Sequence, residues 1–185
     1  PDLAAGVVSV QLDIVTDLDN DGDLDLFVAA PSGNSLLVNR GTGRLAARDP
    51  RRYGLPARHG AAAAWVDYDN DTRLDLYVSP DGLFRNVGRG FRRVGALGTA
   101  GSGTVDGRPA FADVTVAAGL SRPVVPALGA AVGDFDTDGW LDLYVANDGR
   151  PNHLWIHRGT PGVPTFEDRA LLAGRNREGT HLVHV

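Results

Sequence analysis

The sequence predicts an all-β fold, a partial β-propeller of about three four-stranded antiparallel blades. Three observations carry this prediction. An aspartate-rich segment occurs three times, each copy continues into an apolar stretch that alternates with period two, and the similarity between copies extends well beyond that stretch. The repeating unit is therefore strand, acidic loop, strand, turn, strand, turn and strand. Four short strands per repeat are typical of one propeller blade.

The first half of each unit centres on the acidic loop. Loop one covers residues 17–25, loop two residues 67–75 and loop three residues 134–142, and all three have aspartate at positions one, three, five and nine. Small residues at 60–66 and 129–133 precede loops two and three, and they predict first strands that pack closely against their neighbours. The alternating stretch that starts at the end of each loop predicts the second strand of the blade.

The second half of each unit is equally regular. A further apolar segment that ends in a glycine turn predicts the third strand, and it occurs at residues 34–41, 81–88 and 152–159. Phe111-Ala112-Asp113 matches Phe166-Glu167-Asp168 and predicts the fourth strand, for which residues 45–54 are a weaker counterpart. An Ala-Gly pair follows at equal distance in both, at 118–119 and 173–174.

These matches set the expected organisation of the chain. We expect repeat one at about residues 5–58, repeat two at about 59–126, repeat three at about 127–179 and the start of a further blade at 180–185. Repeat two is longer because of the Gly-rich segment 98–107, which predicts a loop insertion, either a solvated excursion or a binding loop. Because propellers typically have four to eight blades, we expect the chain to be part of a longer protein rather than a self-assembling ring.

The acidic loops predict a metal site. Carboxylates on alternate residues of a tight loop converge and repel one another unless a cation lies between them. Oxygen ligands from positions one, three, five and nine, together with the backbone carbonyl of position seven, suit Ca²⁺ better than Mg²⁺, which prefers a strict octahedron. The candidate ligands are Asp17, Asp19, Asp21, Asp23 and Asp25; Asp67, Asp69, Asp71, Arg73 and Asp75; and Asp134, Asp136, Asp138, Trp140 and Asp142, with Asp23, Arg73 and Trp140 acting through backbone carbonyls.

Two other interpretations of the loops account for the sequence less well. An EF-hand requires glutamate at position twelve and a following helix, whereas these loops have valine there and lead into strands. Alternatively the aspartates only cap their own turns, an interpretation that three matching copies make less attractive.

Glycine at position six, in Gly22 and Gly139, permits a positive φ. Thr72 replaces it in loop two and Arg73 adds a cation, so this site is expected to be weaker, distorted or empty.

Composition excludes several other classes of function. The chain has no cysteine, which excludes disulfides, zinc thiolates and cysteine nucleophiles, and no apolar run approaches the ~20 residues of a membrane span. A formal net charge of -5 with no basic stripe argues against nucleic-acid binding. The histidines and serines lack a catalytic context, so we expect no enzyme.

Trp65 and Trp155 are expected to pack between blades and Trp140 to be exposed.

The chain resembles the FG-GAP/VCBS repeat family, whose blades carry Asp-x-Asp-x-Asp-Gly-x-x-Asp-Leu followed by an aromatic residue and valine. Residues 17–28 and 134–145 match this motif, and the segments 34–41 and 111–120 are closer to the bacterial and cartilage-acidic-protein branch. The resemblance implies structural calcium sites in an extracellular or periplasmic, secreted or surface-attached module. Its partners would be a protein or glycan ligand and the remaining blades or other subunits.

Two alternative functions remain open at this point. The chain could be part of a calcium-dependent polysaccharide lyase or hydrolase, in which arginines attract acidic glycans and tryptophans stack on sugars. It could also be a structural subunit of a larger assembly. The resemblance favours an adhesion or interaction module over both, because the family meets its partners on loops other than the calcium loops.

Overall fold

A computed structural model describes residues 12–18, 22–39, 41, 43–80, 82–87, 111–120, 127–159 and 165–170. Within these residues the fold is all-β, as the sequence predicts, with one short 3₁₀ helix, η1. The expected insertion at 98–107 and the expected further blade at 180–185 lie outside the described residues, as do Asp19 and Asp21 of loop one. None of the described helices is long and apolar enough to cross a membrane.

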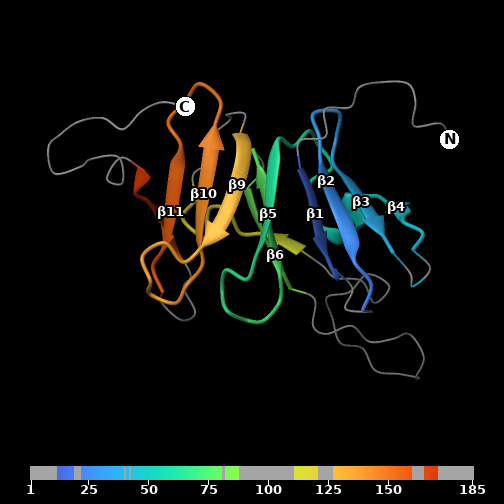
Figure 1. Cartoon of the computed structure of the whole chain (residues 1–185), viewed down its shortest axis with the longest axis horizontal. Helices are drawn as coiled ribbons and strands as arrows, with labels where there is room; N and C mark the ends of the chain where they lie inside the picture. The colour runs from blue at the N-terminus through green and yellow to red at the C-terminus, as the bar shows by residue number, and fades with distance from the viewer. Residues whose placement is uncertain are drawn as a thin grey trace, which may run out of the picture.

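The strands form three separate four-stranded antiparallel sheets, which we call blades one, two and three (Figure 1). In each blade the strands pair in chain order. Blade one contains β1 (Leu12–Thr16), β2 (Asp25–Ala29), β3 (Ser35–Val38) and β4 (Ala46–Arg48), and η1 (Pro50–Tyr53) follows it. Blade two contains β5 (Ala62–Val66), β6 (Asp75–Ser79), β7 (Gly82–Asn86) and β8 (Phe111–Asp113). Blade three contains β9 (Ala127–Gly133), β10 (Asp142–Asn147), β11 (His153–His157) and β12 (Phe166–Asp168).

The register of the first hairpin is the same in all three blades. The aspartate at position nine pairs with the last residue of the first strand, as Asp25 with Thr16, Asp75 with Val66 and Asp142 with Gly133. The intervening residues form the connection between these two strands. Each acidic loop is therefore held at both ends by the same strand pair, which fixes where its carboxylates point.

The blades pack side by side along their first strands. In Figure 1, β5 lies between β1 and β9, and it contacts both of them. This packing depends on small side chains, because Ala62, Ala63 and Ala64 of β5 are all buried. The arrangement of strands and blades is that of a partial β-propeller.

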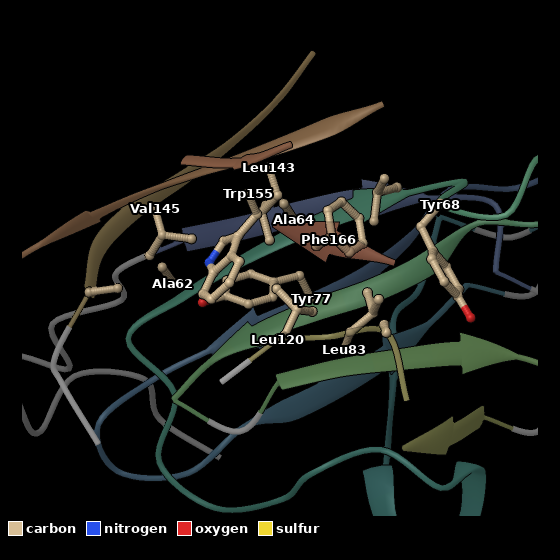
Figure 2. Close-up of a cluster of buried hydrophobic side chains, with 13 residues drawn as sticks. Ala62, Ala64, Tyr68, Tyr77, Leu83, Leu120, Leu143, Val145, Trp155 and Phe166 are labelled. Carbon is tan, nitrogen blue, oxygen red and sulfur yellow. The ribbon is translucent and has the colours of Figure 1, made fainter. Parts of the chain in front are cut away.

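The core lies between the blades. One buried cluster, which includes Phe27, Leu36, Leu76 and Phe111, joins blades one and two. A second cluster joins blades two and three, and Figure 2 shows its side chains, among them Tyr77, Leu143, Trp155 and Phe166. Apolar faces of neighbouring sheets thus bury one another, as expected for stacked repeats.

The tryptophan predictions are partly confirmed. Trp155 is buried in the second cluster, and Trp65 is partly buried against Phe27 of blade one and Phe111 of its own blade. The expectation that Trp140 is exposed is wrong. Its indole stacks on the His157 imidazole, with ring centroids 4.5 Å apart and planes inclined by 6°, and this contact leaves Trp140 only partly exposed.

A glycine after the fourth strand makes the same close contact at each interface between blades. Gly54, with φ of 79°, lies against the backbone carbonyl of Phe111 in β8. Gly119, also with φ of 79°, lies against the carbonyl of Phe166 in β12. At the second interface the Phe166 amide also donates to the carbonyl of Ala118 at 2.8 Å. These glycines allow the end of one blade to approach the outer strand of the next.

Candidate metal centres

The position-nine aspartates are structural braces in all three blades. Asp25, Asp75 and Asp142 are at most 1% exposed. One oxygen of each accepts from the backbone amide of position two, at 2.8, 3.2 and 2.7 Å. The other accepts from the amide at the end of the third strand, in Asn39, Asn86 and His157, at 2.8, 2.6 and 2.8 Å. Each carboxylate therefore ties the loop to two strands.

Burial also changes the acidity of one brace. It raises the pKa of the Asp75 carboxyl to about 8, although the amides of Asn86 and Tyr68 oppose this by donating to it. The nearby negative charges of Asp69 and Asp71 contribute to this raised pKa. Burial thus favours the protonated form of Asp75, while the two amide donors favour the carboxylate.

Positions one, three and five form the candidate metal groups. In loop two, Asp67, Asp69 and Asp71 each offer one carboxylate oxygen, and these atoms lie within 4.8 Å of one another. Loop three brings its equivalent carboxylates together in the same way, in Asp134, Asp136 and Asp138. Three hard oxygen ligands at this spacing can hold a metal ion. The group is partly buried in loop two and exposed in loop three.

The same aspartates also cap the turn. Asp134 accepts from the amides of Asp138 at 3.1 Å and Gly139 at 3.0 Å, and Asp138 accepts from the amide of Trp140 at 2.9 Å. Loop two repeats these three contacts at 2.9–3.0 Å. Because a carboxylate oxygen has two lone pairs, capping and metal binding are compatible. Turn capping by these aspartates is therefore observed, and it is compatible with a metal ion at the same carboxylates.

Loop one is described only in part. Asp17, at position one, accepts from the amide of Gly22 at 3.0 Å, which is the contact that Asp67 and Asp134 make with position six of their loops. Asp25 forms the same brace as its equivalents. The described residues of loop one thus follow the geometry of loop three, whose sequence it matches at positions one, three, five, six and nine.

Position six has a positive φ in every loop, as predicted. The values are 90° for Gly22, 89° for Gly139 and 68° for Thr72. Glycine adopts this conformation without steric cost, whereas a β-branched residue does not. Thr72 therefore strains loop two at position six, whereas in loop three the β-branched residue with positive φ is Thr137 at position four, with φ of 62°.

Substitutions at position six of loops two and three should change the free energy of unfolding in opposite directions. Gly139→Thr is expected to destabilise blade three by about 1–2 kcal/mol, because the left-handed conformation disfavours a side chain while nothing lies within 4 Å of the new Cβ. Thr72→Gly should stabilise loop two by less than about 1 kcal/mol, since glycine relieves the strain but orders more backbone. Chemical denaturation in chelator measures both, and shifts of the same sign would contradict the assignment of strain.

Two arginines contact the carboxylates of loop two. Arg85 of β7 lies 2.6 Å from Asp69 Oδ2 and 3.3 Å from Asp71 Oδ2, and Arg73 pairs with the same Asp71 oxygen. Burial raises the pKa of Asp69, as does the charge of Asp71, and Arg85 partly offsets both. Arg73 is expected from the sequence as a cation near loop two, whereas Arg85 was not predicted. The signal was available, because Arg85 occupies the repeat position of the apolar residues Val38 and Ile156.

Trp140, at position seven of loop three, packs on the imidazole of His157. This histidine is fully buried, its Nδ1 accepts from the amide of Gly159 at 2.8 Å, and burial lowers its pKa. The neutral imidazole is therefore favoured, and it supports the Trp140 indole beside the carboxylate group. His153 also has a partner, because its Nδ1 lies 2.5 Å from Asp168 Oδ2.

The fold and these loops define the class of protein, a β-propeller-like repeat module whose aspartate clusters can hold a metal ion. Residues 17–78, which run from position one of loop one into β6, match the family model described as FG-GAP-like repeat. The match covers about a third of the chain and supports the FG-GAP repeat family for this segment. Comparison with curated proteins finds no match to the chain.

Proposed function

We propose that the chain is a calcium-binding module of an extracellular or periplasmic protein, in which structural Ca²⁺ fastens the acidic loops and other surfaces bind a protein or glycan partner. The observation that carries the proposal is the convergence of three carboxylates in loop three, on a loop held at both ends by the brace of Asp142. Carboxylate and carbonyl oxygens are the ligands of Ca²⁺.

The exposure of loop three supports an extracellular location. Its three carboxylates are open to water, and a site of this kind is expected to bind Ca²⁺ in the 10⁻⁴–10⁻³ M range typical of extracellular modules. Such a site is filled where calcium is abundant. The resemblance to the bacterial and cartilage-acidic-protein branch points to the same location.

Several features favour an interaction module over an enzyme. Two histidines have structural contacts: His157 is buried under Trp140, and His153 pairs with Asp168. Apolar side chains beside the loops are available for a partner, because Leu24 and Leu74 at position eight are 60% and 42% exposed. A protein or glycan could contact these side chains without displacing the metal.

An internal comparison indicates where further blades or subunits would pack. The residue at position two is buried in the first two loops, with Leu18 5% and Tyr68 4% exposed, because the next blade covers it. Its equivalent in blade three, Phe135, is 50% exposed, and Leu128 of β9 is 53% exposed. We propose this face as the contact for a remaining blade or another subunit.

Calcium should raise the melting temperature of the chain, because a ligand that binds only the folded state stabilises it. At 10 mM Ca²⁺, a site with the affinity above contributes about 1.4–2.7 kcal/mol. Asp136→Ala should reduce this gain and change little in chelator, whereas Asp148→Ala, an exposed aspartate outside the loops, should preserve it. Melting curves that are identical with and without Ca²⁺ would refute the proposal.

A further inference from the structure

We propose that Arg73 and Arg85 close loop two in place of a divalent cation, so that blade two keeps its acidic loop ordered without metal. This inference rests on the proposed function only in taking Ca²⁺ as the ion that loops one and three bind. It separates the three loops into two that need metal and one that supplies its own positive charge.

The two guanidinium groups reach the carboxylates from different elements. Arg73 lies within the loop, pairs with Asp71 and donates through Nε to the carbonyl of Asn86 at 3.1 Å, which holds it against the end of β7. Arg85 extends from β7 itself and bridges Asp69 and Asp71. The Asp69 side chain is only 8% exposed, so its contact with Arg85 is shielded from water and weakly screened.

The position of Arg85 conflicts with a metal ion. Ca²⁺ would lie about 2.3–2.6 Å from each carboxylate oxygen. An Arg85 nitrogen already lies 2.6 Å from Asp69 Oδ2, and Arg73 contacts the Asp71 oxygen that would be the next ligand. The guanidinium groups thus occupy carboxylate oxygens that a metal ion would need, so we expect arginine and metal to compete for this group. The two arginines also bring the same total charge as one Ca²⁺.

The other repeats lack arginine at both of these positions. At the position of Arg85 they carry the buried apolar residues Val38 and Ile156. At the position of Arg73 they carry Asp23 and Trp140. Loop two also lacks the position-six glycine. Its departures from the other two copies therefore concentrate around one carboxylate group, as expected if arginine has replaced the ion.

Counting bound Ca²⁺ by equilibrium dialysis of the full chain tests the inference. Asp69→Asn should leave the number of ions per chain unchanged, whereas Asp136→Asn should lower it by one. The double variant R73W/R85I, which copies loop three, should bind one ion more than the wild type. A loss of one ion in Asp69→Asn would overturn the inference, and no loss in Asp136→Asn would instead refute the proposed function.

A measurement in chelator tests the arginines without any metal. Arg85→Val should lower the melting temperature by about 2–4 °C, because it leaves the Asp69 carboxylate buried and unpaired. Arg51→Val is the matched control, since Arg51 also pairs with an aspartate but its side chain is 76% exposed, and it should shift the melting temperature by less than about 1 °C. Equal shifts in the two variants would count against closure of loop two by Arg85.

Discussion

Asp142→Ala is expected to lower the free energy of unfolding by about 2–6 kcal/mol, even in chelator. The Asp142 side chain is fully buried, and its two oxygens accept from the amides of Phe135 and His157. Alanine would leave two donors unpaired at the junction of loop three, β10 and β11, the buried amide of His157 and the part-buried amide of Phe135. An unsatisfied buried donor costs about 1–3 kcal/mol. The effect should be largely independent of metal because these donors belong to the protein.

Asp136→Ala in the same loop is the control for this prediction. Its side chain is exposed, so in chelator the substitution should change the free energy of unfolding by less than about 0.5 kcal/mol. Urea denaturation of the two variants and the wild type, followed by tryptophan fluorescence, gives the comparison. If both variants lost the same stability, the brace would not be the main role of Asp142.

Gly54→Ala is expected to cost about 3 kcal/mol by separating blades one and two. A Cβ at this position would lie 2.1 Å from the carbonyl oxygen of Phe111, and backbone on both sides of the contact leaves little room to yield. The left-handed conformation adds about 1–2 kcal/mol for any residue with a side chain. The strain and the clash both act at the interface between blades, where one core cluster is buried.

Gly43→Ala isolates the two contributions. Gly43 has a similar φ of 68°, but nothing lies within 4 Å of its added Cβ, so this variant carries only the backbone strain of about 1–2 kcal/mol. Denaturation curves of both variants in the same buffer measure the difference. A Gly54→Ala variant no less stable than Gly43→Ala would contradict the close contact between the blades.

Much of the fold could be predicted because the repeat is written in the sequence. Aspartates at fixed positions followed by an alternating strand identified the first hairpin of each blade, and the structure pairs Asp25, Asp75 and Asp142 in the same register. Positive φ at position six also followed from the residue type, since glycine favours it in two copies. Local pattern and local conformation are closely linked in such short-range features.

The different roles of the aspartates within one loop could not be predicted in the same way. Spacing places four aspartates in one loop but does not show that Asp142 is buried while Asp136 is exposed. That difference arises because the third strand returns and donates an amide from His157, fifteen residues away. The stacking of Trp140 on His157 depends on the same return. Whether position nine also binds metal stays a prediction, as do the repeat boundaries.

Arg85 illustrates a signal that was present but required comparison between repeats. Taken alone, an arginine in a strand is an ordinary surface residue. Superposed on Val38 and Ile156, it is a charge at a position where the other blades are apolar, next to a loop that carries excess negative charge.

A crystal structure grown with Ca²⁺, with the ions located by anomalous scattering, tests the central claim most directly. We expect a peak in loop three bound by Asp134, Asp136 and Asp138, an equivalent peak in loop one, and the Arg85 guanidinium beside Asp69 in loop two. If crystals grown at a saturating Ca²⁺ concentration showed no peak in loops one and three, the proposed calcium module would be contradicted. A peak bound by Asp69 and Asp71 would contradict the closure of loop two by arginine.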